Sequence, residues 1–222
     1  MGWIPADRTL GPGNNVPRGR SVLATVAGCG GWRRSWRWWA GSGWWPAGGG
    51  SSAPKAGSYV GKVAGTDAYI ALVTKGDKVA GYVCDGAKVS VWLPAASVSG
   101  HAATLANRRG ASVGTARWSG SAASGTVSID GVTHAFSAAL ATGDAGLYRA
   151  VHGTPGQTGA VEVGWVVLPD GTQRGLITSF VTPISTLAAP KLDTSSTSVN
   201  ITAGSFSSSL VVNKFISPIS TF

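Results

Sequence analysis

The sequence predicts an all-β protein: an antiparallel meander that closes into an up-and-down barrel or a strongly bent sheet, with disordered N- and C-terminal tails. Three observations predict this class. Apolar and polar residues alternate with a period of two through the middle of the chain. Short connections rich in glycine and aspartate separate the apolar segments. The 222 residues include 33 glycines, a single glutamate and only 12% charged residues, which disfavours helices.

Eleven short segments have the character of strands, and they follow one another at regular intervals. They cover residues 59–63, 68–73, 79–84, 88–93, 101–106, 112–118, 125–129, 132–140, 146–151, 160–168 and 174–178. Tight turns are indicated at Lys75-Gly76-Asp77, Asp85-Gly86, Asp130-Gly131 and Asp170-Gly171, because these residues tolerate the backbone angles of hairpin loops.

The connections are too short to hold crossover helices, so successive strands should pair antiparallel. A long open meander exposes two edges, and closing the sheet removes them. Glycines inside the predicted strands, such as Gly61, Gly81 and Gly164, fit the bends that closure requires. Aromatic residues recur about once per strand, and we expect most of them to pack in the core.

The chain divides into four parts by composition. Residues 1–45 are an atypical segment rich in Arg and Trp, and residues 46–57 are a flexible linker rich in Gly, Ser and Pro. Residues 58–179 are predicted to form the β-barrel-like domain. Residues 180–222 are a Ser/Thr-rich tail that we expect to be mostly disordered, with residues 210–216 left open as a final edge strand.

The N-terminal part holds a candidate lipidation site. Arg18 and Arg20 precede a short apolar run that ends in Val26-Ala27-Gly28-Cys29, which resembles the lipobox of bacterial lipoproteins. The resemblance implies that Cys29 is lipidated and tethers the domain to a membrane. The apolar run is short, and an Arg/Trp-rich stretch replaces the usual soft linker after the cysteine. Two alternatives stay open: a chance match, and a gene start downstream of Met1.

The charge of the chain does not indicate a nucleic-acid-binding protein, although the net charge is +9 and the pI is about 10.1. Six arginines against Asp7 place +5 of this charge in residues 1–50. The rest of the chain has no stripe of Lys and Arg, so we expect no nucleic-acid partner.

Catalytic and metal-binding motifs are missing from the sequence. His101, His134 and His152 are not spaced as a zinc motif, and the two cysteines form no CxxC pair. No G-x-S-x-G motif occurs, and most carboxylates lie in predicted turns. We therefore predict no catalytic residue, no metal and no cofactor.

Four segments carry a resemblance to a known family: residues 59–61, 80–86, 143–150 and 164–175, the last reading GWVVLPDGTQRG. Residues 57–178 thereby resemble an extracytoplasmic all-β domain found in actinobacterial lipoproteins and in the ectodomains of membrane-bound Ser/Thr kinases. The resemblance implies a location in the cell envelope, or secretion, and a non-enzymatic role. No activity is established for that family, so it transfers no catalytic residue.

Candidate ligand-binding residues are Arg149 and Arg174, which interrupt apolar strands, and the aromatic residues Tyr82, Trp92 and Trp165. An arginine is costly to bury unpaired, so each should point outward or meet an anion. We expect a non-catalytic extracytoplasmic domain that binds or senses a small ligand, a cell-wall component or a protein. The alternative is a small-ligand carrier with a cavity inside the barrel, and a cryptic hydrolase ranks third.

Overall fold

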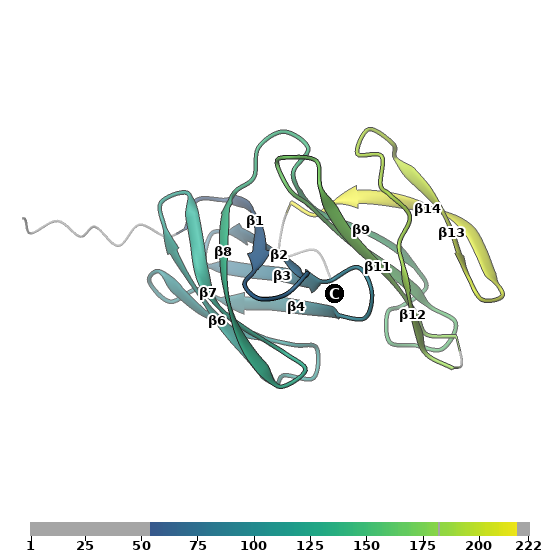
Figure 1. Cartoon of the computed structure of the whole chain (residues 1–222), viewed down its shortest axis with the longest axis horizontal. Coiled ribbons are helices and arrows are strands. Elements are labelled where there is room, and N and C mark those ends of the chain that lie inside the picture. The colour runs from purple at the N-terminus through teal and green to yellow at the C-terminus, as the bar shows by residue number, and fades with distance from the viewer. Residues whose placement is uncertain (1–53, 182, 217–222) are drawn as a thin grey trace, which may run out of the picture. The chain divides into compact units, whose positions relative to one another are not determined.

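A computed structural model describes residues 54–181 and 183–216, all within the compact unit Ala47–Phe222. These residues form fourteen strands in two sheets, with no helix among them. The predicted N-terminal segment, Cys29 and residues 46–53 of the linker lie outside the described residues. Figure 1 shows β1–β8 and β9–β14 as two groups of strands.

The first sheet is a nearly closed up-and-down barrel, as predicted. Its strands follow the order β4-β3-β2-β1-β8-β7-β6-β5, and β1 pairs antiparallel with β8. The remaining seam lies between β4 and β5, which are consecutive in the chain, and an isolated bridge pairs Ser99 in their connection with Ala102 at the start of β5. The strands are β1 (Gly57–Val63), β2 (Tyr69–Lys75), β3 (Lys78–Cys84), β4 (Ser90–Ser97), β5 (Ala102–Ala106), β6 (Ser112–Ser119), β7 (Ala122–Ile129) and β8 (Val132–Leu140).

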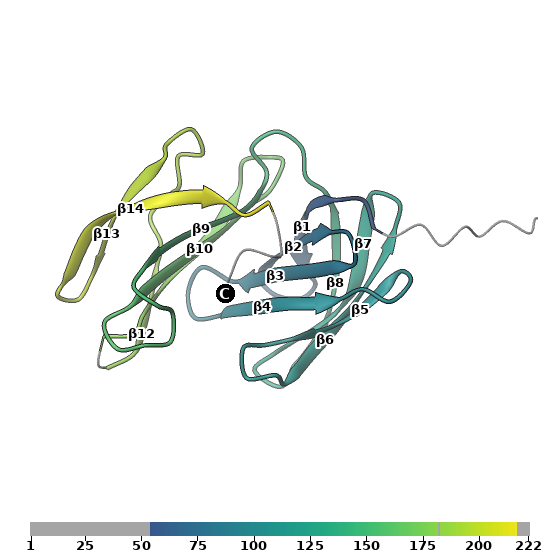
Figure 2. The ribbon, with the colours of Figure 1, turned by 180° about the vertical axis from the view of Figure 1, so that it is seen from behind.

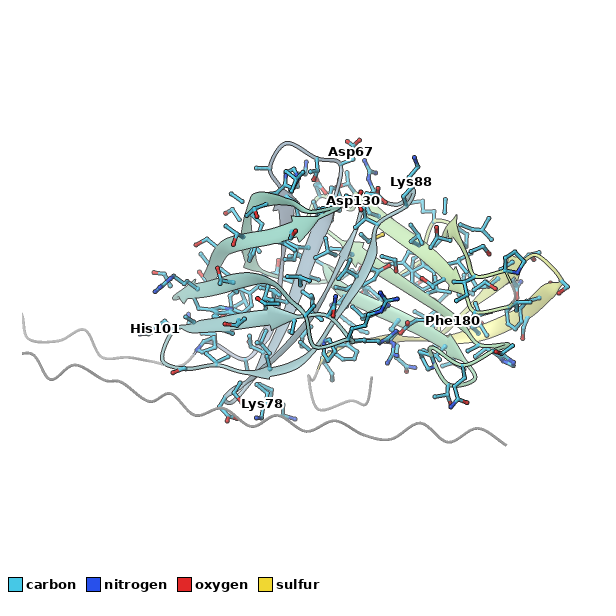
Figure 3. The ribbon with its side chains drawn as sticks, turned by 90° about the horizontal axis from the view of Figure 1, so that it is seen from below. Asp67, Lys78, Lys88, His101, Asp130 and Phe180 are labelled. Atoms are coloured by element: carbon cyan, nitrogen blue, oxygen red, sulfur yellow. The ribbon has the colours of Figure 1, made fainter. Side chains whose placement is uncertain are left out.

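Alternate hairpins of the meander lie at opposite ends of the barrel. Asp67, Lys88 and Asp130 mark turns at one end, and Lys78 lies at the other (Figure 3). The predicted Asp130-Gly131 turn joins β7 to β8, and both residues have positive φ, 50° and 81°. This is the backbone that a two-residue hairpin of matching twist requires.

Side chains fill the interior of the barrel. Tyr59, Leu72, Trp118 and Phe136 are all buried there, and the rings of Tyr59 and Trp118 meet edge to face at 6.5 Å. On β6, β7 and β8 buried and exposed residues alternate, because the outer face of these strands meets solvent.

The second sheet is a curled half-barrel with the order β12-β11-β10-β9-β14-β13. The expectation of one barrel over residues 58–179 is therefore wrong in one respect: the barrel ends at Leu140, and β9–β11 belong to the second sheet. The chain leaves the barrel because β8 has already paired with β1, which uses the free edge of the meander. The strands are β9 (Gly146–His152), β10 (Val161–Val167), β11 (Gln173–Ser179), β12 (Ser185–Ala188), β13 (Ser198–Ala203) and β14 (Phe206–Lys214).

The expectation of a mostly disordered tail over residues 180–222 is also wrong for much of its length. Strands β12, β13 and β14 lie in it, and β14 pairs with β9, which answers the open question about residues 210–216. Ile201, Leu210 and Val212 are buried on one face of the sheet, while Ser and Thr occupy exposed positions. The alternation of apolar and polar residues determines the structure here, although the composition alone resembles that of a disordered segment.

The barrel wall formed by β1–β4 is apolar on both faces. Ile70, Leu72 and Val83 point into the barrel, while Ala71 and Tyr82 point outward against the second sheet. The second sheet meets this wall with Leu147, Val166 and Leu176. Figure 2 shows β3 and β4 on the side of the barrel nearest to β9 and β10. One layer of strands thus serves two cores.

A substitution at Gly164 on β10 can test how tightly the two sheets pack. A Cβ atom at this position would lie 2.6 Å from Cε1 of Tyr82 and 2.8 Å from Cζ2 of Trp92. Gly164→Ala should therefore lower the free energy of unfolding by about 1–3 kcal/mol, measured by urea denaturation. Ser124→Thr adds one methyl group at an exposed strand position and should change it by less than about 0.5 kcal/mol. Equal stability of the two variants would contradict close contact at Gly164.

Candidate functional site

The single glutamate of the chain, Glu162, lies on β10 with its side chain toward the barrel. Val161 and Val163 pack into the apolar cluster on the other face of the sheet, so the alternation of β10 turns Glu162 the opposite way. Its side chain is 1% exposed. A carboxylate at this depth requires cationic partners to offset the loss of water.

Two arginines from separate elements bind this carboxylate. Arg108 lies in the β5–β6 turn of the barrel, and its Nη1 and Nη2 donate to Oε2 and Oε1 of Glu162, each at 2.6 Å. Arg149 lies on β9, and its Nε and Nη2 lie 2.9 and 2.7 Å from Oε1. The side chains of Arg108 and Arg149 are 29% and 11% exposed. This cluster connects the barrel to the second sheet and carries a formal charge of +1.

The turn that presents Arg108 is held by its first residue, Asn107. The Oδ1 atom of Asn107 accepts hydrogen bonds from the backbone N–H groups of Arg109 and Ala111 at 2.9 and 3.1 Å. Backbone bonds from Asn107 to Ala111 and from Gly110 to Asn107, both 2.9 Å, close the turn. Arg108 and Arg109 therefore extend from a fixed piece of backbone.

Trp92 on β4 forms the aromatic part of the site. The guanidinium carbons of Arg149 and Arg108 lie 5.1 and 5.8 Å from the centroid of its ring, within the range of cation–π attraction. The ring of Tyr82 lies 4.2 Å from that of Trp92, with an angle of 31° between the planes. Gly164 leaves the space that both rings occupy.

A short chain of hydroxyl groups also crosses between the two sheets. The hydroxyl of Tyr82 lies 3.1 Å from Oγ of Ser90, which lies 3.1 Å from Oγ1 of Thr178 on β11. Burial raises the pKa of Tyr82 well above its usual value, so its phenol stays neutral at physiological pH.

A cavity of about 500 Å³ opens beside these groups, between β4 and the β5–β6 turn on one side and β10 and β11 on the other. We call it the Glu162 cavity. Phe180, which follows β11 in the second sheet, is one of its apolar walls (Figure 3). Its lining is Ser90, Val91, Trp92, Asn107, Arg108, Arg109, Gly156, Glu162, Thr178, Phe180 and Ile184.

A larger cavity, of about 680 Å³, lies among the loops that border β9, β10 and β11. Its charged residues are Asp144, Lys191 and Asp193, all exposed. Hydrogen bonds from Ser195 lower the pKa of Asp193, so this carboxylate stabilises its own turn. The Glu162 cavity differs because its carboxylate is buried and is bound by arginines from both sheets.

The structure brings three of the predicted ligand-binding residues together. Arg149 binds Glu162, the ring of Trp92 lies beside Arg149, and the ring of Tyr82 lies beside Trp92, which also lines the cavity. Their role in binding a ligand stays a prediction.

The other two predicted residues lie elsewhere. The guanidinium carbon of Arg174 lies 5.1 Å from the ring centroid of Tyr69, at the end of the barrel that holds Gly86. Trp165 faces the opposite side of the second sheet, where its Nε1 donates to the carbonyl of Pro190 at 2.9 Å. Neither residue lines the Glu162 cavity.

Sequence reasoning missed Glu162, Arg108 and Arg109 as site residues. A signal for Glu162 was present, since it is the one charged residue within the apolar run of β10. Arg108 and Arg109 lie in a polar turn, where arginine is ordinary and gives no signal.

Cys84, next to the site on β3, is a free and fully buried thiol. Burial raises its pKa to about 11. Since the thiolate is the reactive form, Cys84 is inert at neutral pH and packs as a small apolar residue.

Comparison with known proteins adds no family to this description: no family model, curated protein or solved structure matches the chain. Within residues 54–181 and 183–216, no helix has the length and apolar character to cross a membrane. The same residues contain no group of three side chains arranged to hold a metal ion. The function is therefore inferred from the geometry of the Glu162 cavity together with the sequence.

Removing the charge of Glu162 should destabilise the protein, because two guanidinium groups would lose their shared carboxylate. We expect Glu162→Gln to lower the free energy of unfolding by about 3 kcal/mol in urea denaturation. Asp77→Asn also removes one negative charge, but Asp77 is 75% exposed and lies 3.9 Å from Lys78. That control should change stability by less than about 0.5 kcal/mol. A Glu162→Gln protein as stable as the control would show that the ion cluster does not hold the sheets together.

Proposed function

We propose that this chain is a non-catalytic extracytoplasmic binding or sensing domain of the bacterial cell envelope, with the Glu162 cavity as its ligand site. The cavity is the observation that carries this proposal. It measures about 500 Å³, a size typical of sites for small molecules. Both sheets contribute to its lining, and ligands commonly bind at interfaces between structural units.

The chemistry of the cavity favours binding over catalysis. Both oxygens of Glu162 accept hydrogen bonds from arginines, so this carboxylate serves to hold the two sheets together. The phenol of Tyr82 is held neutral by burial. Fixed charges, hydroxyl groups and an aromatic edge are what a binding site needs to orient a ligand.

A ligand at this position would also suit a sensing role. Trp92 and Arg108 come from the barrel, while Glu162 and Thr178 come from the second sheet. A molecule that contacts both sets stabilises their association, and the gain in stability grows with its concentration. Occupancy can therefore change how firmly the two sheets are joined.

The location in the envelope is supported by the sequence. The Val26-Ala27-Gly28-Cys29 motif, the Gly/Ser/Pro linker at residues 46–57 and the resemblance of residues 57–178 to envelope domains point the same way. We place the ligand outside the barrel, because Tyr59, Trp118 and Phe136 fill the interior where a carrier would hold it.

Ligand screening by NMR on the full chain tests the binding site. Bound molecules should shift the backbone amide signals of Asn107, Thr178 and Phe180, which line the cavity. Signals of β6 and β7 on the far wall of the barrel, such as Ser124, should stay in place. The proposal fails if screening of cell-wall fragments and small metabolites yields no molecule that shifts the cavity signals, or only molecules that bind elsewhere.

Metabolic labelling tests the anchor. In a Gram-positive host, the wild-type protein should incorporate an alkynyl fatty acid and sediment with membranes, while Cys29→Ala should do neither. Cys84→Ala, which removes the other thiol, should keep both properties because Cys84 is buried. Label retained in Cys29→Ala would rule out lipidation at this residue.

A further inference from the structure

The charged side chains of the Glu162 cavity have a positive sum. Arg108, Arg109 and Glu162 line it, and Arg149 binds Glu162 from β9. Three guanidinium groups against one carboxylate give +2, and Glu162 is the one acidic residue in the described lining. A recess with an excess of positive charge attracts anions.

Two of the three arginines are held in place by side-chain contacts, which strengthens the preference for an anion. Arg108 and Arg149 are oriented by Glu162, whose side chain is 1% exposed and fixed on β10. The turn that carries Arg109 is held by Asn107, and Arg109 itself is exposed at the cavity. Groups fixed before binding lose little entropy when an anion arrives.

The rest of the lining is apolar on one side. Val91, Trp92, Phe180 and Ile184 form it, and Ile184 is 70% exposed. A lining with arginines and a group of apolar side chains suits a ligand with two parts. One part is anionic and the other is an apolar chain or ring.

We propose that the Glu162 cavity binds an amphiphilic anion, an organic phosphate or carboxylate, with its charged group at Arg108 and Arg109 and its apolar body against Phe180 and Ile184. This inference rests on the proposed function and names the ligand class of the same site. Guanidinium groups suit phosphate and carboxylate alike, because both present oxygen pairs that match the guanidinium fork.

Isothermal titration calorimetry on the full chain compares four probes: phenyl phosphate, phenylacetate, benzyl alcohol and phenethylamine. The two anions should bind at least about tenfold more tightly than the neutral and cationic probes of similar size. Raising the NaCl concentration should lower the affinity of the two anions, since salt screens charges. The affinity of benzyl alcohol should not change.

Two substitutions at Ile184 separate charge from apolar contact. Ile184→Asp and Ile184→Lys remove the same exposed apolar side chain and add opposite charges at the cavity. Phenyl phosphate should bind Ile184→Lys at least about fivefold more tightly than Ile184→Asp. Ile184 is exposed in the folded chain, so both variants should fold.

A matched pair of arginines tests the anion contact directly. Arg109→Gln should lower the affinity for phenyl phosphate by about tenfold. Arg117→Gln, an equal change at an exposed position on β6, should leave its affinity as in the wild type. Equal affinity in the two variants would overturn the role of Arg109 and with it the proposed anion site.

Sedimentation with lipid vesicles shows whether the anion is a lipid headgroup or a soluble molecule. Sedimentation with phosphatidylglycerol vesicles that depends on Arg109 assigns the anion to a lipid headgroup, and phenyl phosphate binding without sedimentation assigns it to a soluble molecule. Either result is consistent with the proposed anion site.

If neutral or cationic probes shift the amide signals of Thr178 and Phe180 as strongly as the anions do, the proposed ligand class is wrong and the cavity is still a binding site. If no molecule shifts them, the proposed function fails as well.

Discussion

The apolar outer face of the β1–β4 wall is the constraint on which the rest of the structure depends. A barrel in water normally alternates apolar residues inside with polar residues outside, as β6–β8 do. On β2 and β3 the outward residues are also apolar, including Ala71, Val73 and Tyr82. A face of this size cannot remain exposed, so the second sheet has to cover it. The position of β9–β11 against the barrel follows from that need.

The Glu162 cluster lies at the border of this apolar contact, and its position follows from the same layering. Where Val166 and Leu147 stop covering the wall, β10 presents Glu162 and β9 presents Arg149. Arg108 reaches in from the barrel, so charge pairing takes over from apolar packing at the margin. A buried ion cluster adds little net stability compared with apolar packing, but it penalises any arrangement that separates its members. The cluster therefore specifies how the two sheets meet.

Much of the fold was predictable because local rules govern it. The period of two and the Asp-Gly turns gave the strands of the barrel and its closure, and both were confirmed. The tail was misjudged because its Ser/Thr content resembles that of disordered segments. Yet Val199, Ile201 and Ala203 recur at every second position, and Gly204 allows the turn with φ of 62°. The site was only partly predictable. Arg149 and Trp92 stood out in apolar strands, whereas Arg108 acquires its role through a contact 54 residues away in the chain.

The pairing of β14 with β9 has a consequence for the order in which the chain folds. The barrel is complete in sequence by Leu140, where β8 pairs with β1. The second sheet is not: Val212 lies opposite Ala150, and Phe215 donates its N–H to the carbonyl of Leu147. Until those last residues are present, β9 has an unpaired edge, and the ring of Tyr148 lacks its contact with Lys214. Pairings of such long sequence separation form slowly. All eight barrel strands are therefore synthesised before the second sheet can be completed, and the β13–β14 hairpin is the last element that both structures need to reach their final packing.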